Sequence, residues 1–329
     1  MFGLLVPRIR VSRFVFAAEH LLLCDRCKSA EGVSRSASRA FGLFAECHRD
    51  TSRVSDGFGR AQWDAFYDGM SSYDHETQLE NHDIQIKTNS ELIRILQLYN
   101  GTNDVQAYRQ SIKRIQPGVN WSFKAMNLFK NAHRNTRLHN GQPPVMLFAK
   151  SLPQVTLSRK AVDFMLTNMN IDRFVDRIEW NAFGVDENFI GSLNSNDAVG
   201  LPGGFTLHCL RGQVESNYMT RLSIWMDSGK CKSGMYRHYL CLFGMEDIKA
   251  NIEDQPHFFA NKFMPSVDFG AIDCWHRILY NRTHFNRANR LSMRDYKFVD
   301  TVRFNFLKNN YPNFTALNFN CKIDRKMVV

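Results

Sequence analysis

Strand-like and helix-like segments alternate along this chain from about residue 79 onward, and this alternation limits the possible fold more than any other feature. The alternating stretch 84–86 precedes the segment SELIRILQLY, residues 90–99, whose apolar residues recur at helical spacing. They mark one face of the expected helix: Leu92, Ile95, Leu96 and Tyr99. Asn89 is expected to cap this helix and Asn100 to end it. A strand pattern followed by a helix pattern is typical of an α/β fold.

The same order recurs toward the C-terminus. Residues 145–148 predict a strand, which is followed by a turn, a second short strand and a helix capped by Ser158. Residues 239–243 predict a buried strand before another helix, and residues 258–260 end a further strand. The helix expected at 269–282 has one apolar side, formed by Ile272, Trp275, Ile278 and Leu279. We therefore predict an α/β fold with a mainly parallel central sheet flanked by helices.

The first 78 residues lack this organisation. Residues 24–69 are rich in Ser, Arg, Ala and Gly without periodicity, which is typical of poorly ordered chain. Charged residues interrupt the apolar pieces before them, namely Arg8, Arg10, Arg13 and Glu19. Neither a membrane-spanning helix nor a clear signal peptide is therefore predicted. We divide the chain into a divergent, partly disordered or truncated N-terminal region (1–78), a main domain (79–320) and a tail (321–329).

The charge balance indicates an anionic partner. Lys and Arg number 42 against 32 Asp and Glu, which gives a formal net charge of +10. Such a balance suits a polyanion, an acidic membrane surface or a phosphorylated ligand. The positive charges are spread along the chain, and no RNA-binding or helix-turn-helix signature accompanies them. We therefore expect no nucleic-acid partner.

Cysteines and sequons indicate a compartment that permits disulfides. The chain has eight cysteines, an even number, and four Asn-x-Ser/Thr sequons that predict glycosylation at Asn100, Asn120, Asn281 and Asn313. Cys24 and Cys27 have the spacing of half a zinc site, but no second pair at ligand spacing follows them. No metal site is predicted.

Lys262 interrupts an apolar segment in which a charged side chain is unexpected. The apolar run that ends at residue 260 resumes at Phe263, with Asn261 and Lys262 between. Burial of an unpaired ammonium costs several kcal/mol, on the order expected for a lone buried charge. Lys262 should therefore face solvent or a fixed anion.

Five short blocks, in order, resemble the core-2/I-branching β-1,6-N-acetylglucosaminyltransferase family (glycosyltransferase family 14), in particular its nematode-type members. The blocks are DIQIKTNSELIRILQLYNGTNDV (83–105), TLSRKAVDFML (156–166), FGVDENFIGSLN (183–194), RHYLCLFGMEDI (237–248) and PHFFANKFMPSVDFGAIDCW (256–275). The resemblance implies a GT-A-like fold and would make residues 79–320 the catalytic domain. It also implies a Golgi enzyme on the lumenal side of the membrane, although no anchor is visible in this chain.

The resemblance implies a reaction as well as a fold. The donor would be UDP-N-acetylglucosamine, the acceptor a glycan, and no metal ion or other cofactor would be needed. The Asp-x-Asp signature of metal-dependent transferases is absent from the sequence. Fixed cations must then balance the charge of the departing UDP, and the resemblance assigns this role to Arg237 and Lys262. Because Arg237 lies four residues before Cys241, whereas vertebrate members of the family have the arginine three residues before, His238 is an alternative.

Glu187 is the implied general base. Inversion at the sugar needs one displacement, so a single carboxylate suffices to take the proton of the acceptor hydroxyl. Asp186 would be its structural neighbour. The alternative is that Asp186 and Glu187 only begin a helix, where acidic residues favour the helix dipole.

Less specific matches concern the acceptor and the disulfides. Trp225 resembles a family tryptophan that faces the acceptor sugar, but core packing is an equal alternative, and Asp227 stands where the family has tyrosine. The resemblance implies a disulfide between Cys231 and Cys241. It also implies an N-terminal partner for Cys274, which leaves Cys24, Cys27 and Cys47 open. His82 and Trp275 are expected to be packing or structural residues.

Two functions therefore stay open. The first is an inverting, metal-independent transfer of N-acetylglucosamine in β-1,6 linkage. The second is a catalytically inactive lectin-like or scaffold protein on the same fold. The second arises because family catalytic domains begin with a nucleotide-binding strand that has no convincing equivalent in residues 1–78. We expect that nucleotide-binding part to be incomplete or divergent.

Overall fold

The structure is a computed structural model that describes residues 9–11, 75–78, 82–111, 114–179, 186–212, 214, 216, 218–285 and 291–321. The expectations for residues 24–69, for Cys24, Cys27 and Cys47, and for residues 322–329 lie outside the described part of the chain. The boundaries proposed at residues 78 and 320 remain predictions.

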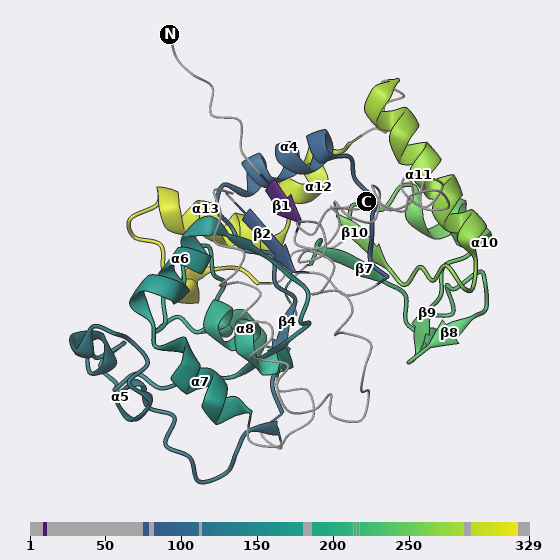
Figure 1. The fold of residues 1–329 in the computed structure, drawn as a ribbon. Coiled ribbons are helices and arrows are strands. Elements are labelled where there is room, and N and C mark those ends of the chain that lie inside the picture. The colour runs from purple at the N-terminus through teal and green to yellow at the C-terminus, as the bar shows by residue number, and fades with distance from the viewer. Residues whose placement is uncertain are drawn as a thin grey trace, which may run out of the picture.

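The described strands form four small sheets. The first has the order β1 (Ile9–Val11), β2 (His75–Gln78), β6 (Val155–Ser158), and the second the order β3 (Ile84–Gln85), β10 (Phe259–Asn261), β7 (Arg221–Ser223). The two pairs are β4 (Ala107–Arg109) with β5 (Ala149–Ser151), and β8 (Tyr236–Arg237) with β9 (Leu240–Cys241). Strands and helices are interspersed along the chain (Figure 1), which confirms the α/β class.

Strand directions are more mixed than the expected mainly parallel sheet. Among the described strands, β1 with β2 and β10 with β7 are parallel, whereas the other four pairings are antiparallel. The two residues that join β8 to β9 can connect only antiparallel strands, because a parallel connection needs a longer crossover. Sequence analysis missed β1 and β2, whose three and four residues are too few to display a clear alternation.

Helix α4 (Asn89–Tyr99) lies where the periodicity predicted it and buries the predicted face. Its N-cap, however, is Thr88 and not Asn89. The Thr88 hydroxyl accepts from the Glu91 amide (3.3 Å), while the Glu91 carboxylate accepts from the Thr88 amide (2.7 Å). This reciprocal capping box needs an acidic residue three positions after the cap, which only Thr88 has. Asn100 ends the helix in the left-handed conformation, with φ 46°.

The segment that was predicted as a strand at 145–148 is displaced. β5 begins at Ala149, and Val145 forms only an isolated bridge with Ser122. The Met146 amide donates to the Trp121 carbonyl at 2.8 Å, so this part of the segment pairs with residues 121–122 and not with β4. The next prediction is confirmed: Ser158 caps α6 (Arg159–Asn168) by accepting from the Ala161 amide at 3.2 Å.

The remaining helices surround these strands. They are α5 (Phe123–Met126), η3 (Ala132–Asn135), α7 (Ile171–Ile178), α8 (Asp186–Ser195), α9 (Leu207–Arg211), η4 (Met226–Ser228), α10 (Met245–Asp247), η5 (Ile248–Ile252), α11 (Phe269–His284), α12 (Met293–Lys297), α13 (Asp300–Asn310) and η6 (Ala316–Asn318). No helix in the described ranges is long and apolar enough to cross a membrane.

Two hydrophobic clusters dominate the core. One packs α6, α7 and α8 against β6, around Phe174 and Phe189. The other packs α11 and η5 against β3, β7, β9 and β10, around Trp275. Trp275 is buried and its indole donates to the Gln85 carbonyl at 2.8 Å, which confirms the structural role expected for it. Figure 1 shows the teal helices of the first cluster and the green helices of the second on opposite sides of β7 and β10.

Candidate active site

Glu187 lies in the first turn of α8, which packs on β5. A Cβ atom placed on Gly191 would come within 2.8 Å of the Ser151 side chain, so only glycine permits this approach. The Ser151 hydroxyl also donates to the Glu187 carbonyl (3.4 Å) and accepts from the Gly191 amide (3.2 Å). The start of α8 is therefore fixed against the strand. The side chain of Asp186, the expected neighbour, lies outside the described part.

Two cations hold the Glu187 carboxylate. Its Oε2 atom pairs with Arg114 Nη1 and lies 3.3 Å from Lys150 Nζ, while the side chain stays 21% exposed. Within the described residues no hydrogen bond or salt bridge involves Oε1. Oε2 is thus held by two cations, and Oε1 has no such partner within the described part of the chain. The position at the start of α8 agrees with a helix-start role and leaves a role as base open.

Arg237 is presented by a tight hairpin. His238 and Tyr239 form the turn between β8 and β9, and both have positive φ, 51° and 65°. Two such residues are the mark of the type I′ turn, whose twist matches that of the strands. Arg237 is exposed, and its Nη1 lies 3.7 Å from Met264 Sδ. No carboxylate in the described ranges forms a salt bridge with it.

Lys262 directly follows β10 and lies beside the same hairpin. Its carbonyl accepts from the Phe243 amide at 2.9 Å, and the next amide, that of Phe263, donates to the His82 carbonyl at 3.0 Å. These bonds place Lys262 beside His82, and the contact of Arg237 with Met264 places Arg237 against the segment that follows Lys262. Burial lowers the pKa of His82, and the charges of Lys262 and Arg237 lower it further. His82 is exposed, so it is not a packing residue, and its carbonyl bond to Phe263 agrees with the structural role that was the other part of the expectation.

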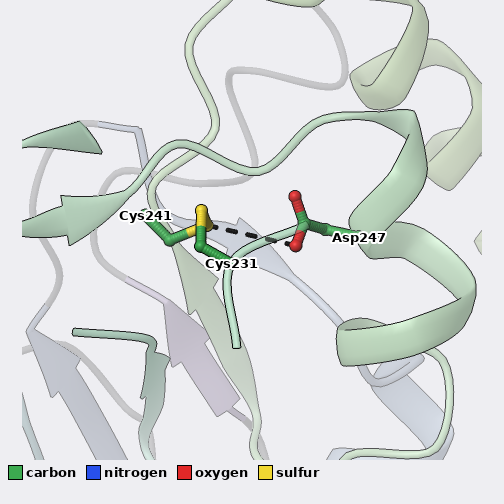
Figure 2. A group of neighbouring side chains, drawn as sticks. All are labelled: Cys231, Cys241 and Asp247. Atoms are coloured by element: carbon green, nitrogen blue, oxygen red, sulfur yellow. Dashed lines mark hydrogen bonds between the residues drawn. A yellow bond between two sulfur atoms is a disulfide. The ribbon is translucent and has the colours of Figure 1, made fainter. Parts of the chain in front are cut away.

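A buried carboxylate and a disulfide fix the hairpin at its base. The structure joins Cys231 to Cys241, as the resemblance implied, and Figure 2 shows Asp247 directed at this disulfide from its helix. Asp247 is fully buried. Its carboxylate accepts four hydrogen bonds: from Lys232 N (2.9 Å), Ser233 N (3.1 Å), Gly244 N (3.1 Å) and Asn251 Nδ2 (2.7 Å). Sequence analysis assigned Asp247 no role, although it lies in a quoted block.

This cluster does not fit a metal ion. The two sulfur atoms and a carboxylate oxygen of Asp247 lie within 4.8 Å of one another. The sulfurs are bonded to each other, however, and thiolate is the form that binds metals. The carboxylate is already occupied by its four donors. The cluster is a structural anchor.

Trp225 lies on the strand segment next to the hairpin. It bridges to Leu240, and its side chain is 45% exposed, so it is not a core residue. Tyr239 at the hairpin turn is 71% exposed, and its carbonyl accepts from the Met226 amide at 2.9 Å. Two aromatic side chains are therefore open to solvent near Arg237.

The predicted site residues form two groups. Arg237, Lys262 and Trp225 belong to the hairpin and the strand ends beside it. Glu187 belongs to α8, among the teal elements in Figure 1, and β7 and β10 lie between α8 and the hairpin in this view. The ion-pair partners of Glu187, Arg114 and Lys150, were not singled out from the sequence.

The predicted sequons have different environments. Asn100, Asn120 and Asn313 are exposed, whereas Asn281 is half-buried within α11. A second disulfide, Cys209 to Cys321, was not predicted beyond the even cysteine count. Cys274 is the free thiol among the described cysteines, and its possible N-terminal partners lie outside the described ranges.

A further group of charged residues, also missed, supports β3 and the start of β10. Lys87 is buried and its ammonium donates to the Gln255 carbonyl. Burial lowers the pKa of Lys87 to about 8. Nearby, His257 has a fully buried Nδ1 atom that finds no hydrogen-bond partner among the residues that the structure describes. Burial, with a smaller contribution from Lys87, lowers the pKa of His257 to about 4.

Comparison with known proteins identifies relatives. A family model described as Core-2/I-Branching enzyme matches residues 69–251. A β-1,3-galactosyl-O-glycosyl-glycoprotein β-1,6-N-acetylglucosaminyltransferase 3 from Rattus norvegicus is 24% identical over 212 residues, which are 61% of this chain and 46% of the relative. An enzyme 4 of the same description from Danio rerio is 29% identical over 206 residues, 58% of this chain and 45% of the relative. The chain thus spans about half the length of these relatives. The mixed α/β arrangement is consistent with the expected GT-A-like fold.

Proposed function

This chain belongs to the Core-2/I-branching enzyme family, and from that premise we propose that it transfers N-acetylglucosamine from UDP-N-acetylglucosamine to a glycan in β-1,6 linkage, with inversion and without a metal ion. The observation that carries the proposal is that the exposed Arg237 contacts Met264, two residues after Lys262, so that both predicted cations belong to one segment of the surface. The names of the matched relatives describe this transfer to β-1,3-galactosyl O-glycans, and we propose an acceptor of that class.

The cationic pair supplies what the departing nucleotide requires. When the sugar leaves, negative charge grows on the diphosphate, and fixed cations that are already in place stabilise that charge without reorganisation. The Arg237 guanidinium offers several donors, and the Lys262 ammonium a compact charge. The disulfide and the Asp247 anchor hold the hairpin that carries Arg237. A fixed pair of cations in this position replaces the role of a divalent ion.

Glu187 is the proposed base. Its Oε2 atom is held by Arg114 and Lys150, and we assign to Oε1 the role of taking the proton of the acceptor hydroxyl as that oxygen attacks the sugar. Trp225 offers an exposed aromatic face, and such faces pack against the apolar side of sugar rings. From the same premise we propose that the protein acts on the lumenal side of the Golgi membrane. We also propose that it carries N-glycans on its exposed sequons.

A second candidate has one observation in its favour. The double ion pair of Glu187 is also what a purely structural carboxylate would make, so the chain could bind glycans without turning over a donor. Incubation of the protein with UDP-N-acetylglucosamine and a panel of O-glycan acceptors separates the two functions. Release of UDP with formation of a β-1,6-linked product supports the transferase. Acceptor binding without UDP release supports the lectin-like protein.

A further inference from the structure

We propose that His82 is the third cationic group of the donor site and takes up a proton when a sugar nucleotide binds there. The inference rests on the proposed function, because it assumes that the diphosphate occupies the site of Arg237 and Lys262. It adds a residue that the family resemblance did not assign. It also makes donor binding depend on pH.

Backbone hydrogen bonds place His82 at this site. Its carbonyl accepts from the amide of Phe263, the residue after Lys262, at 3.0 Å. The Arg237 side chain contacts Met264, two residues after Lys262, at 3.7 Å. His82 and Arg237 therefore both adjoin the segment that begins at Lys262, although 155 residues separate them in the chain (237 minus 82).

The backbone of His82 is in an uncommon conformation. Its φ is 70°, in the left-handed region that non-glycine residues rarely adopt. Such conformations cost on the order of 1–3 kcal/mol and cluster at functional sites. The next residue, Asp83, is buried and lies 3.7 Å from Arg221, so its charge has its own partner within the core. The charges that act on the exposed imidazole are those of Lys262 and Arg237.

Without a ligand, these surroundings oppose protonation of His82. Burial and the two positive charges lower the pKa of His82 below its ordinary value of 6.5. A bound diphosphate reverses the balance, because its two negative charges neutralise the neighbouring cations and attract the imidazolium directly. The pKa of His82 must then be higher in the complex than in the free protein. Binding between these two pKa values takes up protons, and donor affinity rises as pH falls.

Isothermal titration calorimetry of UDP-N-acetylglucosamine tests this. Its diphosphate is esterified at both ends, so the ligand contributes no ionisation near neutral pH. Titrations at pH 6.5 in two buffers of different ionisation enthalpy give the number of protons taken up, and titrations at pH 8 and pH 6 give the change in affinity. We expect net uptake of up to about one proton per donor bound, because one imidazole is involved, and a higher affinity at pH 6 than at pH 8.

His82→Gln should abolish the proton uptake and flatten the pH dependence. The matched control is His133→Gln, because His133 is an exposed histidine on η3, remote in sequence from the site. It should behave like the parent. If the parent binds the donor with the same enthalpy in both buffers, the role of His82 is refuted and the proposed function stands. If the parent does not bind the donor at all, both are refuted. If His82→Gln fails to fold, equal binding enthalpies of the parent protein in the two buffers would still refute the proposed proton uptake.

Discussion

Replacement of Asp247 by Asn tests whether the anchor under the hairpin holds Arg237. The change keeps the size of the side chain but replaces one carboxylate oxygen with an amide group. In the parent, one oxygen accepts from Lys232 N and Asn251 Nδ2, and the other from Ser233 N and Gly244 N. Whichever side the amide takes, it faces two donors and can accept from neither.

The loss can be estimated from these four bonds. Two are lost, and the remaining two become bonds to a neutral acceptor. Hydrogen bonds to a charged group contribute about 1.5–3 kcal/mol each, and an unsatisfied buried donor costs about 1–3 kcal/mol. Because a water molecule could satisfy part of the loss, we expect Asp247→Asn to lower the free energy of unfolding by about 2–4 kcal/mol. UDP affinity should fall together with it, since the lost bonds hold residues 232, 233 and 244 around the Arg237 hairpin.

Urea unfolding and calorimetric titration with UDP measure the two effects. The matched control is Asp227→Asn, since Asp227 is exposed on η4 near the same hairpin. The control should change the free energy of unfolding by less than about 0.5 kcal/mol. An Asp247→Asn protein with parental stability and parental UDP affinity would refute the anchor. Lower stability with unchanged UDP affinity in the folded protein would show that Asp247 supports the fold but not Arg237.

Two further predictions concern single residues. In Glu187→Gln the side chain cannot take a proton, so turnover should fall about 10²- to 10⁴-fold in steady-state assays. UDP affinity should stay near the parental value. Near-parental turnover would mean that another group takes the proton. His257, whose pKa is lowered to about 4, is neutral in the folded protein while the unfolded chain binds a proton below about pH 6.5. The free energy of unfolding should therefore fall by up to about 3 kcal/mol as pH falls from 6.5 to 4. In His257→Gln, urea unfolding should show a smaller fall in the free energy of unfolding over this pH range. An equal fall in both proteins would contradict a buried, neutral His257.

Sequence patterns within a few residues correctly predicted the features that neighbouring residues determine. The apolar face of α4 and the Ser158 cap of α6 follow from periodicity and from a hydroxyl at the right position. The error at the start of α4 has a local cause too. Thr88 and Asn89 are both good caps, and Glu91 decides between them because it lies three residues after Thr88.

Long-range pairings were beyond these patterns. Arg114 meets Glu187 across 73 residues, and Cys209 meets Cys321 across 112. The spacing of apolar residues carries no information about such a contact, and an even number of cysteines does not determine which thiols pair. A shared place for Arg237 and Lys262 was anticipated only because both lie in blocks that resemble a known family. The position of His82 beside this segment depends on the hydrogen bond from the Phe263 amide to its carbonyl, which the sequence does not reveal.

Transfer of labelled N-acetylglucosamine from UDP-N-acetylglucosamine to a β-1,3-galactosyl O-glycan, in excess EDTA, tests the central claim most directly. The account predicts a β-1,6-linked product whose rate of formation is unaffected by the chelator. Lys262→Ala should weaken UDP binding by about 1–3 kcal/mol, whereas Lys249→Ala, which removes an exposed lysine paired with Glu253, should not. Transfer that is lost in EDTA and restored by manganese would contradict the account, as would the absence of transfer from the folded protein.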